Sequence, residues 1–242
     1  MSDAVSDAVS DVVNGGAQED ANDKLIAHIQ HIRQSIPPSV RLIAVTKTFP
    51  ASAVRAAYAA GIRDFGESKV QEAAAKQAEL GDLADITWHL IGHLQTNKAR
   101  KALQQFDWIH AVDSLKLAQR LSQLSTQLNC QPACCLQVKL LDDPQKYGFS
   151  VEALKAALPH LNQLPHLRIK GLMAIPPYGL PATAIKSVFE QTRELANEIN
   201  RMGFSQVQIE QLSMGMSGDF QIAIAAGSTM IRLGTILFGH RG

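Results

Sequence analysis

A lysine that ends an apolar run is the first residue of this sequence whose position could do chemistry. Residues 42–46 read Leu-Ile-Ala-Val-Thr, and Lys47 follows them just before Phe49 and Pro50. At the carboxyl end of a buried strand, its amine would stand at the mouth of an apolar site, where desolvation favours the neutral form. A neutral amine is a nucleophile that can form a Schiff base with an aldehyde or another carbonyl compound. Taken alone, a surface lysine at a strand end is the simpler interpretation.

Two later segments combine glycine and hydroxyl residues in the manner of anion-binding loops. They cover residues 213–219 and 227–235, which include Gly215, Ser217, Gly234 and Thr235. Glycine lets the backbone approach a phosphate, and we expect Ser217 to cap a helical run over residues 220–226. Two neighbouring junctions of this kind resemble the phosphate site after the seventh and eighth strands of a (β/α)₈ barrel. Ordinary turns with helix caps are the alternative.

Composition favours one soluble globular domain. The chain has 242 residues, a formal net charge of +1 and 46% hydrophobic residues, which allows a sizeable core and gives no indication of nucleic-acid binding. No apolar run has membrane-spanning length, and no basic segment followed by an apolar one opens the chain, so we expect a cytoplasmic protein. Cys130, Cys134 and Cys135 lack ligand spacing, and we expect small apolar residues rather than a disulfide or a metal site.

The chain divides into a short tail and one α/β domain. Residues 1–20 repeat Ser-Asp-Ala-Val and contain little that could build a core, so we expect a disordered tail before a domain over residues 21–242. That domain opens with a helical pattern over residues 25–36, which Pro37 and Pro38 end. Strands are predicted at 41–46, 62–66, 86–91, 108–112, 133–140, 167–174, 207–212 and 229–233. Helices are predicted at 51–60, 68–79, 96–104, 114–128, 151–160, 182–202 and 218–226.

Eight strands in strict alternation with helices predict a single (β/α)₈ TIM barrel. There is no GxGxxG after the first strand and no P-loop, so a dinucleotide or P-loop nucleotide site has little support. Functional side chains of such a barrel lie at the carboxyl ends of its strands, where the sequence also places Ser68, His93, Lys146 and Arg232. A structural ion pair or carbonyl clamp is the alternative for Arg232, and a solvated loop lysine is the alternative for Lys146. We expect His89 to pack in the core.

Several motifs match a known family in order along the chain. They are residues 44–47 (AVTK), 65–67 (FGE), 88–98 (WHLIGHLQTNK), 171–173 (GLM), 212–217 (LSMGMS) and 226–235 (AGSTMIRLGT). From about residue 24 to the end, the chain resembles the YggS/PROSC family of pyridoxal phosphate homeostasis proteins. The fold of this family is similar to the barrel domain of alanine racemase, a fold-type III pyridoxal phosphate enzyme.

The resemblance implies a cofactor and a set of residues that bind it. The cofactor is pyridoxal 5′-phosphate (PLP), with Lys47 holding it as an internal aldimine and Arg232 beside the pyridine nitrogen. Ser217, Gly234 and Thr235 would hold the phosphate. Ser68 departs from the family pattern, because many members have asparagine there, so any contact made by that amide is in doubt.

An arginine beside the ring nitrogen limits the chemistry that the cofactor can do. A guanidinium only donates hydrogen bonds, so the nitrogen must stay unprotonated and the ring is a weak electron sink. Alanine racemase adds an opposing acid/base from a second domain and a partner subunit, and we expect neither here. The prediction is therefore a non-catalytic PLP-binding protein of intracellular vitamin B6 homeostasis, with PLP-dependent apoenzymes as candidate partners. The alternatives are a PLP-dependent amino-acid racemase using His93 or water as the second base, and a cofactor-free Schiff-base enzyme.

Overall fold

The computed structural model describes residues 22–143 and 146–239 of the chain. A helix covers residues 22–34, as the spacing of its isoleucines predicts, and it ends before Pro37 and Pro38. Ile29 and Ile32 of this helix are buried, and so is Ile36 just after its end. The predicted tail over residues 1–20 lies outside the described residues.

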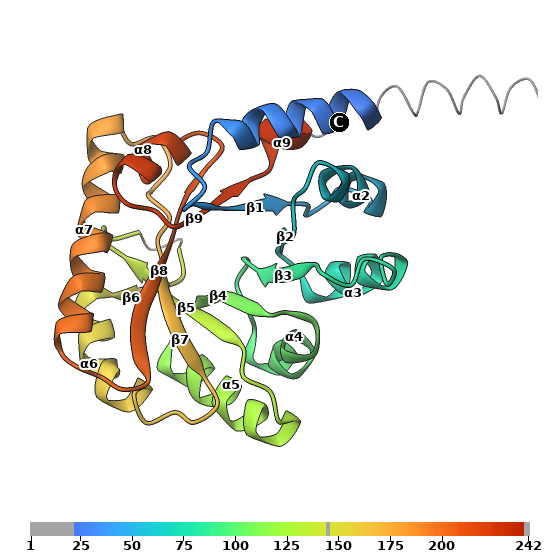
Figure 1. Cartoon of the computed structure of the whole chain (residues 1–242). Helices are drawn as coiled ribbons and strands as arrows, with labels where there is room; N and C mark the ends of the chain where they lie inside the picture. The colour runs from blue at the N-terminus through green and yellow to red at the C-terminus, as the bar shows by residue number, and fades with distance from the viewer. Residues whose placement is uncertain (1–21, 144–145, 240–242) are drawn as a thin grey trace, which may run out of the picture.

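Eight parallel strands close into a barrel, which confirms the predicted fold class (Figure 1). They are β1 (Arg41–Val45), β2 (Asp64–Glu67), β3 (Thr87–Leu90), β4 (Trp108–Val112), β5 (Ala133–Lys139), β7 (Arg168–Met173), β8 (Val207–Met216) and β9 (Met230–Leu233). Pairing of β1 with β9 and of β4 with β5 closes the ring. A two-residue strand, β6 (Phe149–Ser150), adds to the edge of β5.

Helices follow the strands and surround the barrel. They are α2 (Ala51–Ala59), α3 (Val70–Glu79), η1 (Thr96–Lys98) with α4 (Ala99–Gln105), α5 (Leu115–Leu128), α6 (Val151–Leu161), α7 (Ala182–Arg201), α8 (Phe220–Ala225) and α9 (Thr235–Phe238). Several of these helices begin or end at a residue whose type favours that position. Ser114 and Ser150 accept hydrogen bonds from backbone amides as N-caps of α5 and α6. Asn129 ends α5 in the left-handed conformation, with φ 50°.

The sequence-based predictions miss three features near the carboxyl ends of the strands. The seventh barrel strand, β8, runs to Met216 rather than ending at residue 212, so Ser213 to Met216 are strand and not loop. Ser217 is not the N-cap of α8, because Asp219 occupies that position. The four-residue helix α9 is too short to show a helical period.

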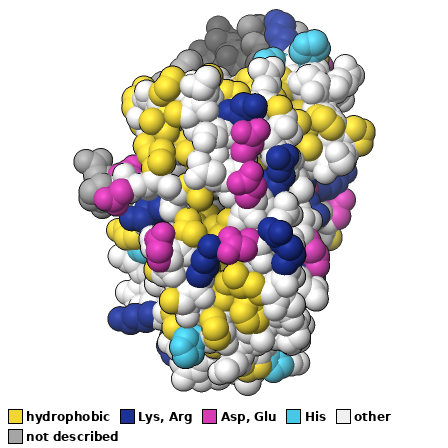
Figure 2. Space-filling view, turned by 90° about the vertical axis from the view of Figure 1, so that its left-hand side faces the viewer, with side chains coloured by type: hydrophobic (Ala, Val, Ile, Leu, Met, Phe, Trp, Pro, Cys, Tyr) yellow, Lys and Arg dark blue, Asp and Glu magenta, His cyan; other side chains and the backbone are white. Residues whose placement is uncertain are grey.

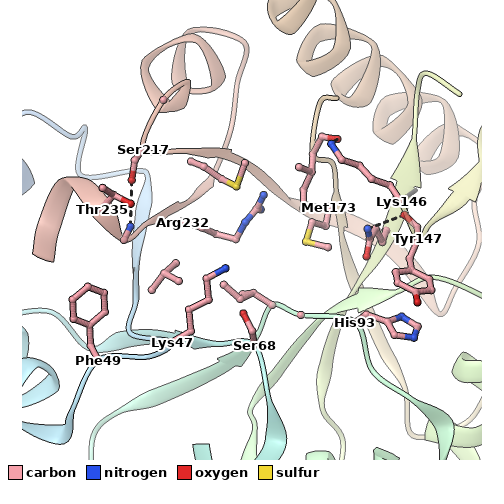
Figure 3. A pocket seen from close by; sticks show the side chains of 18 residues that line it. Lys47, Phe49, Ser68, His93, Lys146, Tyr147, Met173, Ser217, Arg232 and Thr235 are labelled. Atoms are coloured by element: carbon pink, nitrogen blue, oxygen red, sulfur yellow. Dashed lines mark hydrogen bonds between the residues drawn. The ribbon is translucent and has the colours of Figure 1, made fainter. Parts of the chain in front are cut away.

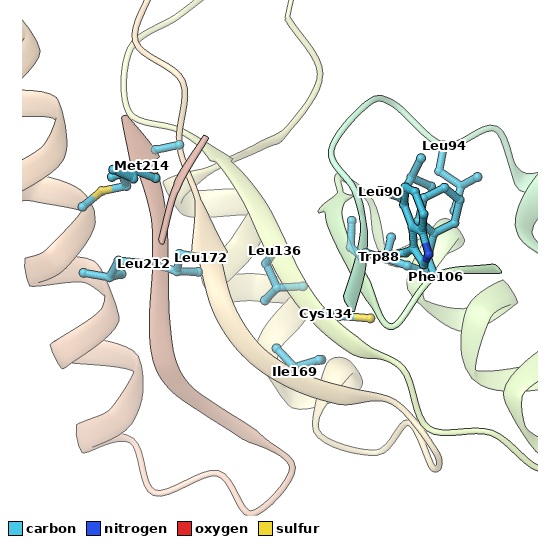
Figure 4. Packing of buried hydrophobic residues seen from close by; sticks show 14 of the residues in the cluster. Trp88, Leu90, Leu94, Phe106, Cys134, Leu136, Ile169, Leu172, Leu212 and Met214 are labelled. Atoms are coloured by element: carbon cyan, nitrogen blue, oxygen red, sulfur yellow. The ribbon is translucent and has the colours of Figure 1, made fainter. Parts of the chain in front are cut away.

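Side chains alternate between the barrel interior and the layer under the helices. Cys135, Ala111 and Met173 pack together inside. Their neighbours in the strands face the helices, where Figure 4 shows Cys134, Leu136, Ile169, Leu172 and Leu212 in the main core. Trp88, Leu90, Leu94 and Phe106 fill the same layer next to α4. This core fixes the strands and, through them, the side chains at their carboxyl ends.

The outer face formed by α6 and α7 carries charges of both signs. Figure 2 shows acidic and basic side chains interspersed there, and Lys155 of α6 pairs with Glu198 of α7 at 2.7 Å. Exposed pairs of this kind contribute little to stability but keep a face solvated. No helix in the described part of the chain is long and apolar enough to cross a membrane.

Candidate cofactor site

A cavity of about 480 Å³ opens at the carboxyl ends of the strands (Figure 3). This volume is within the usual range for a small-molecule site. The predicted residues that line it are Lys47, Ser68, His93, Lys146, Ser217, Arg232, Gly234 and Thr235. Strand ends that are far apart in the sequence therefore bring two amines, one guanidinium and several hydroxyl groups to one place.

Lys47 lies two residues after the end of β1, and its side chain points into the cavity in Figure 3. The turn after it is held tightly, because Phe49 N donates to Thr46 O at 3.0 Å. Thr48 has φ 68°, a left-handed conformation that a β-branched residue rarely adopts. The backbone N–H of Thr48 is held by the carboxylate of Glu72. Residues in such strained conformations cluster at functional sites. Here the left-handed Thr48, held by Glu72, sets the path of the backbone next to Lys47.

The opposite side of the cavity carries groups suited to an anion. Ser217 Oγ accepts long hydrogen bonds from Gly234 N at 3.4 Å and from Ile236 N at 3.3 Å, at the start of α9. Such long bonds are weak, so a phosphate oxygen could replace the hydroxyl and gain stronger, charge-assisted bonds. Thr235 adds a second hydroxyl on the same side. Gly234 packs closely on β1, since a Cβ there would lie 3.3 Å from Val45 O.

Arg232 lies in β9, lines the cavity and is only 4% exposed. Its Nη1 donates to Ser213 O at 2.7 Å and to Ser213 Oγ at 2.5 Å, and its Nη2 donates to Ala174 O at 3.4 Å. Burial lowers the pKa of Arg232 to about 10, which leaves the guanidinium charged at neutral pH. The carbonyl contacts anticipated as an alternative are present, and the side chain faces the cavity as well.

His93 and Tyr147 form one rim of the cavity. Their rings stack with centroids 3.6 Å apart and an interplanar angle of 9°. His93 Nδ1 is 2.8 Å from Asp113 Oδ2, so a carboxylate orients the imidazole. Stacking and hydrogen bonding together hold His93 at the border of the cavity.

Lys146 is held by backbone oxygens rather than solvated in its loop. Its Nζ donates to Pro176 O at 2.5 Å and to Ile175 O at 3.4 Å, and Asp143 Oδ2 lies 3.8 Å away. The amine therefore ties its loop to the segment after β7 while lining the cavity. The position of Lys146 after a predicted strand indicated the active face, but nothing in the sequence indicates these carbonyl partners.

Gly215 is not among the residues that line the cavity. It has φ +91°, and a Cβ there would lie 2.6 Å from Ala223 Cβ and 3.0 Å from Phe220 Cα. The glycine thus allows β8 to pass close to α8. Its place in the structure is explained by packing, and direct cofactor contact is not needed to account for it.

Several cavity residues were not predicted from the sequence. They are Val45, Phe49, Ile91, Gly92, Gln137, Tyr147, Met173, Ile175, Met216 and Gly218. Most are apolar residues of strand ends that no motif distinguishes from core. Two carried a usable signal: Gly218 lies in the segment 213–219 expected to bind an anion, and Tyr147 follows Lys146 in the loop already placed on this face.

The chain matches the family model for the alanine racemase N-terminal domain over residues 21–242. It is 51% identical over 207 residues to the pyridoxal phosphate homeostasis protein of Synechocystis, covering 86% of this chain and 94% of that relative. The corresponding protein of Pseudomonas aeruginosa is 45% identical over 221 residues, covering 90% and 93%. This chain belongs to the pyridoxal phosphate homeostasis protein family. The predicted resemblance is therefore confirmed.

Solved structures agree with this family membership. PipY of Synechococcus elongatus, with PLP bound, has 52% identity to this chain and a TM-score of 0.85, covering 89% of this chain and 100% of PipY. Alanine racemase of Clostridium difficile shares the fold at 15% identity and a TM-score of 0.71, and this chain covers 57% of its length. The family fold thus extends from the homeostasis proteins to one part of a larger enzyme.

Proposed function

We propose that this family member binds pyridoxal 5′-phosphate in the cavity at the carboxyl ends of the strands and serves vitamin B6 homeostasis. The observation that carries the proposal is the convergence of Lys47, Arg232 and the Ser217–Thr235 side on one cavity. The donor set suits the cofactor: a primary amine for its aldehyde, hydroxyl and amide groups for its phosphate, and a guanidinium for its ring nitrogen. The bound cofactor supplies an aldehyde that condenses with primary amines.

Each residue has a separate part in holding the cofactor. Lys47 would supply the primary amine that condenses with the aldehyde of the cofactor. Ser217 and Thr235, with the amides of Gly234 and Ile236, bind the phosphate. Arg232 donates to the ring nitrogen, while His93 and Lys146 border the cavity beside it. Ser68 lies within reach of the cavity as a short hydroxyl and would act on the cofactor through water.

We further propose that the protein holds PLP without catalytic turnover, so that free aldehyde is buffered and PLP-dependent apoenzymes can receive it. Support comes from the names of the relatives and from Arg232, which can donate but cannot supply the proton that makes the ring a strong electron sink. A racemase is the second candidate, because His93 and Tyr147 also line the cavity and His93 has a carboxylate partner.

A titration followed by absorption spectroscopy tests the binding proposal. PLP added to the protein should produce a visible band with one site per chain, and pyridoxal, which lacks the phosphate, should bind far more weakly. Equal affinities for the two aldehydes would contradict the phosphate site.

Exchange of the α-proton of an amino acid in deuterated water, followed by NMR, separates the carrier from the racemase. The carrier predicts no inversion and exchange far below the usual enzymatic range, which begins at about 1 s⁻¹. Inversion at or above that rate, lost in His93→Gln or Tyr147→Phe, would establish the racemase instead.

A further inference from the structure

A chain of hydrogen bonds crosses the barrel interior from Asp64 to Arg232. Asp64 Oδ1 is 2.9 Å from His89 Nε2, and His89 Nδ1 is 2.9 Å from His110 Nε2. His110 Nδ1 is 2.8 Å from Ser213 Oγ, to which Arg232 Nη1 donates at 2.5 Å. We call these five residues the polar relay. Cofactor contact does not explain four of them, because the cavity lining does not include Asp64, His89, His110 or Ser213.

The polar relay joins the two ends of the barrel. His110 lies on β4 and Ser213 on β8, strands that are not neighbours in the sheet, so their bond must pass through the interior. His89, His110 and Ser213 are fully buried. Asp64 begins β2 at the amino-terminal end of the barrel, where its side chain is 20% exposed and lies 3.6 Å from Arg41. Arg232 stands at the other end, beside the cavity.

Only one arrangement of protons satisfies every bond of the polar relay when both histidines are neutral. The Asp64 carboxylate can only accept, so His89 must carry its proton on Nε2 and accept at Nδ1. His110 then carries its proton on Nε2 and accepts at Nδ1 from the Ser213 hydroxyl. Ser213 Oγ in turn accepts from Arg232, which can only donate. Burial lowers the pKa of both histidines, which agrees with neutral rings.

This order gives the polar relay a direction that suits its two charged ends. The bonds described for Arg232 all go to oxygen atoms of uncharged groups. Every dipole between Arg232 and Asp64 has its negative end toward the guanidinium and its positive end toward the carboxylate. Aligned hydrogen bonds in a low-dielectric interior strengthen one another. The charge of Asp64 therefore helps to stabilise the buried guanidinium of Arg232, although three residues of the polar relay lie between them.

We propose that His89, His110 and Ser213, anchored by Asp64, are positioning residues that hold Arg232 as a fixed hydrogen-bond donor toward the cofactor ring nitrogen. The role of Arg232 at that nitrogen rests on the proposed function above. The polar relay itself can be tested without cofactor. It ties the electronic state of the bound ring to a carboxylate at the far end of the barrel.

The first test is ¹⁵N NMR of the histidine rings in the cofactor-free protein at neutral pH. His89 and His110 should both appear as neutral Nε2–H tautomers. Asp64→Asn keeps the shape of the side chain but removes its charge. It should change the ¹⁵N chemical shifts of both histidine rings, although His110 contacts His89 and not Asp64. An Nδ1–H tautomer at either ring, or a shift confined to His89, would overturn the proposal.

The second test measures PLP affinity and the visible absorption maximum. Asp64→Asn should weaken binding about 2-fold to 30-fold, the range for changes transmitted through a coupled network, and should move the maximum. Asp85→Asn is the matched control, because Asp85 also precedes a strand at the amino-terminal end but bonds to Arg63 and Tyr58. This control should match the unaltered protein.

The outcomes separate this inference from the proposed function. An unaltered protein that fails to bind PLP would refute the proposed function while leaving the NMR result intact. Normal binding with an unchanged affinity and maximum in Asp64→Asn would refute the positioning role alone. If Asp64→Asn does not fold, Ser213→Ala is the second variant. It removes the hydroxyl next to Arg232 but keeps the backbone oxygen of residue 213 that Arg232 contacts. The same changes in PLP affinity and absorption maximum are expected.

Discussion

Lys76 and Glu67 form a buried ion pair, with Nζ and Oε1 2.5 Å apart, directly behind the residue that precedes Lys47. Lys76 Nζ also donates to Thr46 O at 2.7 Å, and Thr46 Oγ1 donates to the same Glu67 oxygen at 2.7 Å. Lys76 is 5% exposed and Glu67 is fully buried. The pair therefore ties α3 and β2 to the end of β1, where the lysine of the site begins.

Removing one partner of this pair should be strongly destabilising. Lys76→Met leaves Glu67 buried without its cation, and we expect a loss of about 3–5 kcal/mol in the free energy of unfolding. Chemical denaturation measures it. The double variant Lys76→Met with Glu67→Gln should recover a large part of that loss, because residue 67 no longer carries a buried charge without a partner. Equal instability of the single and double variants would contradict this explanation.

Acidification below pH 6.5 should destabilise the protein through its buried histidines. Burial lowers the folded-state pKa of His89 and His110 below the ordinary 6.5, so below that pH the unfolded chain binds protons that the folded chain does not. Their contribution is fully present above pH 6.5 and is lost as pH falls toward the folded-state values, by up to about 1.4 kcal/mol per pH unit for each ring.

The measurement is the free energy of unfolding between pH 7 and pH 5 for the unaltered protein and for His110→Gln. Glu67 acts in the opposite direction, since burial raises its pKa, so the difference in slope between the two proteins is the quantity that decides. The variant should show the shallower slope. Parallel curves would mean that His110 has the same pKa in the folded and unfolded states.

Substitution by alanine should change the stability of the protein at Gly215 but not at Gly218. Gly215→Ala places a Cβ in contact with α8 at a positive φ and should cost about 1–3 kcal/mol of stability. Gly218→Ala is the matched control, because a Cβ there meets nothing within 4 Å. Melting curves of both variants test the difference. A Gly215→Ala protein as stable as Gly218→Ala would show that the close approach is relieved without cost.

The two hydroxyl groups near α9 should contribute to affinity only when the ligand carries a phosphate. Ser217→Ala and Thr235→Val should each weaken PLP binding by about 1–3 kcal/mol, the usual penalty when a charged acceptor loses a partner. Titration with pyridoxal is the internal control and should show no comparable loss. The same loss for both ligands would place these residues elsewhere than at the phosphate.

The barrel and eight of the residues that line its cavity follow from sequence patterns that are local. Alternating strands and helices are visible as short periodic segments, and Lys47, Ser217 and Arg232 sit beside strand ends that these segments define. The end of β8 was missed because Gly215 looks like a turn residue, whereas its positive φ occurs within the strand. The left-handed Thr48 was missed as well, since nothing in its residue type favours that conformation.

The polar relay could not be predicted, because its contacts depend on how the strands are staggered around the barrel. His89 was expected to pack in the core, and it is fully buried, but its bonds to Asp64 and His110 cross between strands. His110 and Ser213 are 103 residues apart in the chain. Their contact is set by the closure of the barrel, a property of the whole fold rather than of any segment.

Borohydride reduction followed by peptide mapping tests the central claim most directly. The loaded protein should carry one pyridoxyl group, on the peptide that contains Lys47. Lys47→Arg should lose both the label and the visible band, whereas Lys146→Arg, which alters the other lysine lining the cavity, should keep the label on Lys47. A Lys47→Arg protein that retains the band, with its label on Lys146 or on another lysine, would contradict the account.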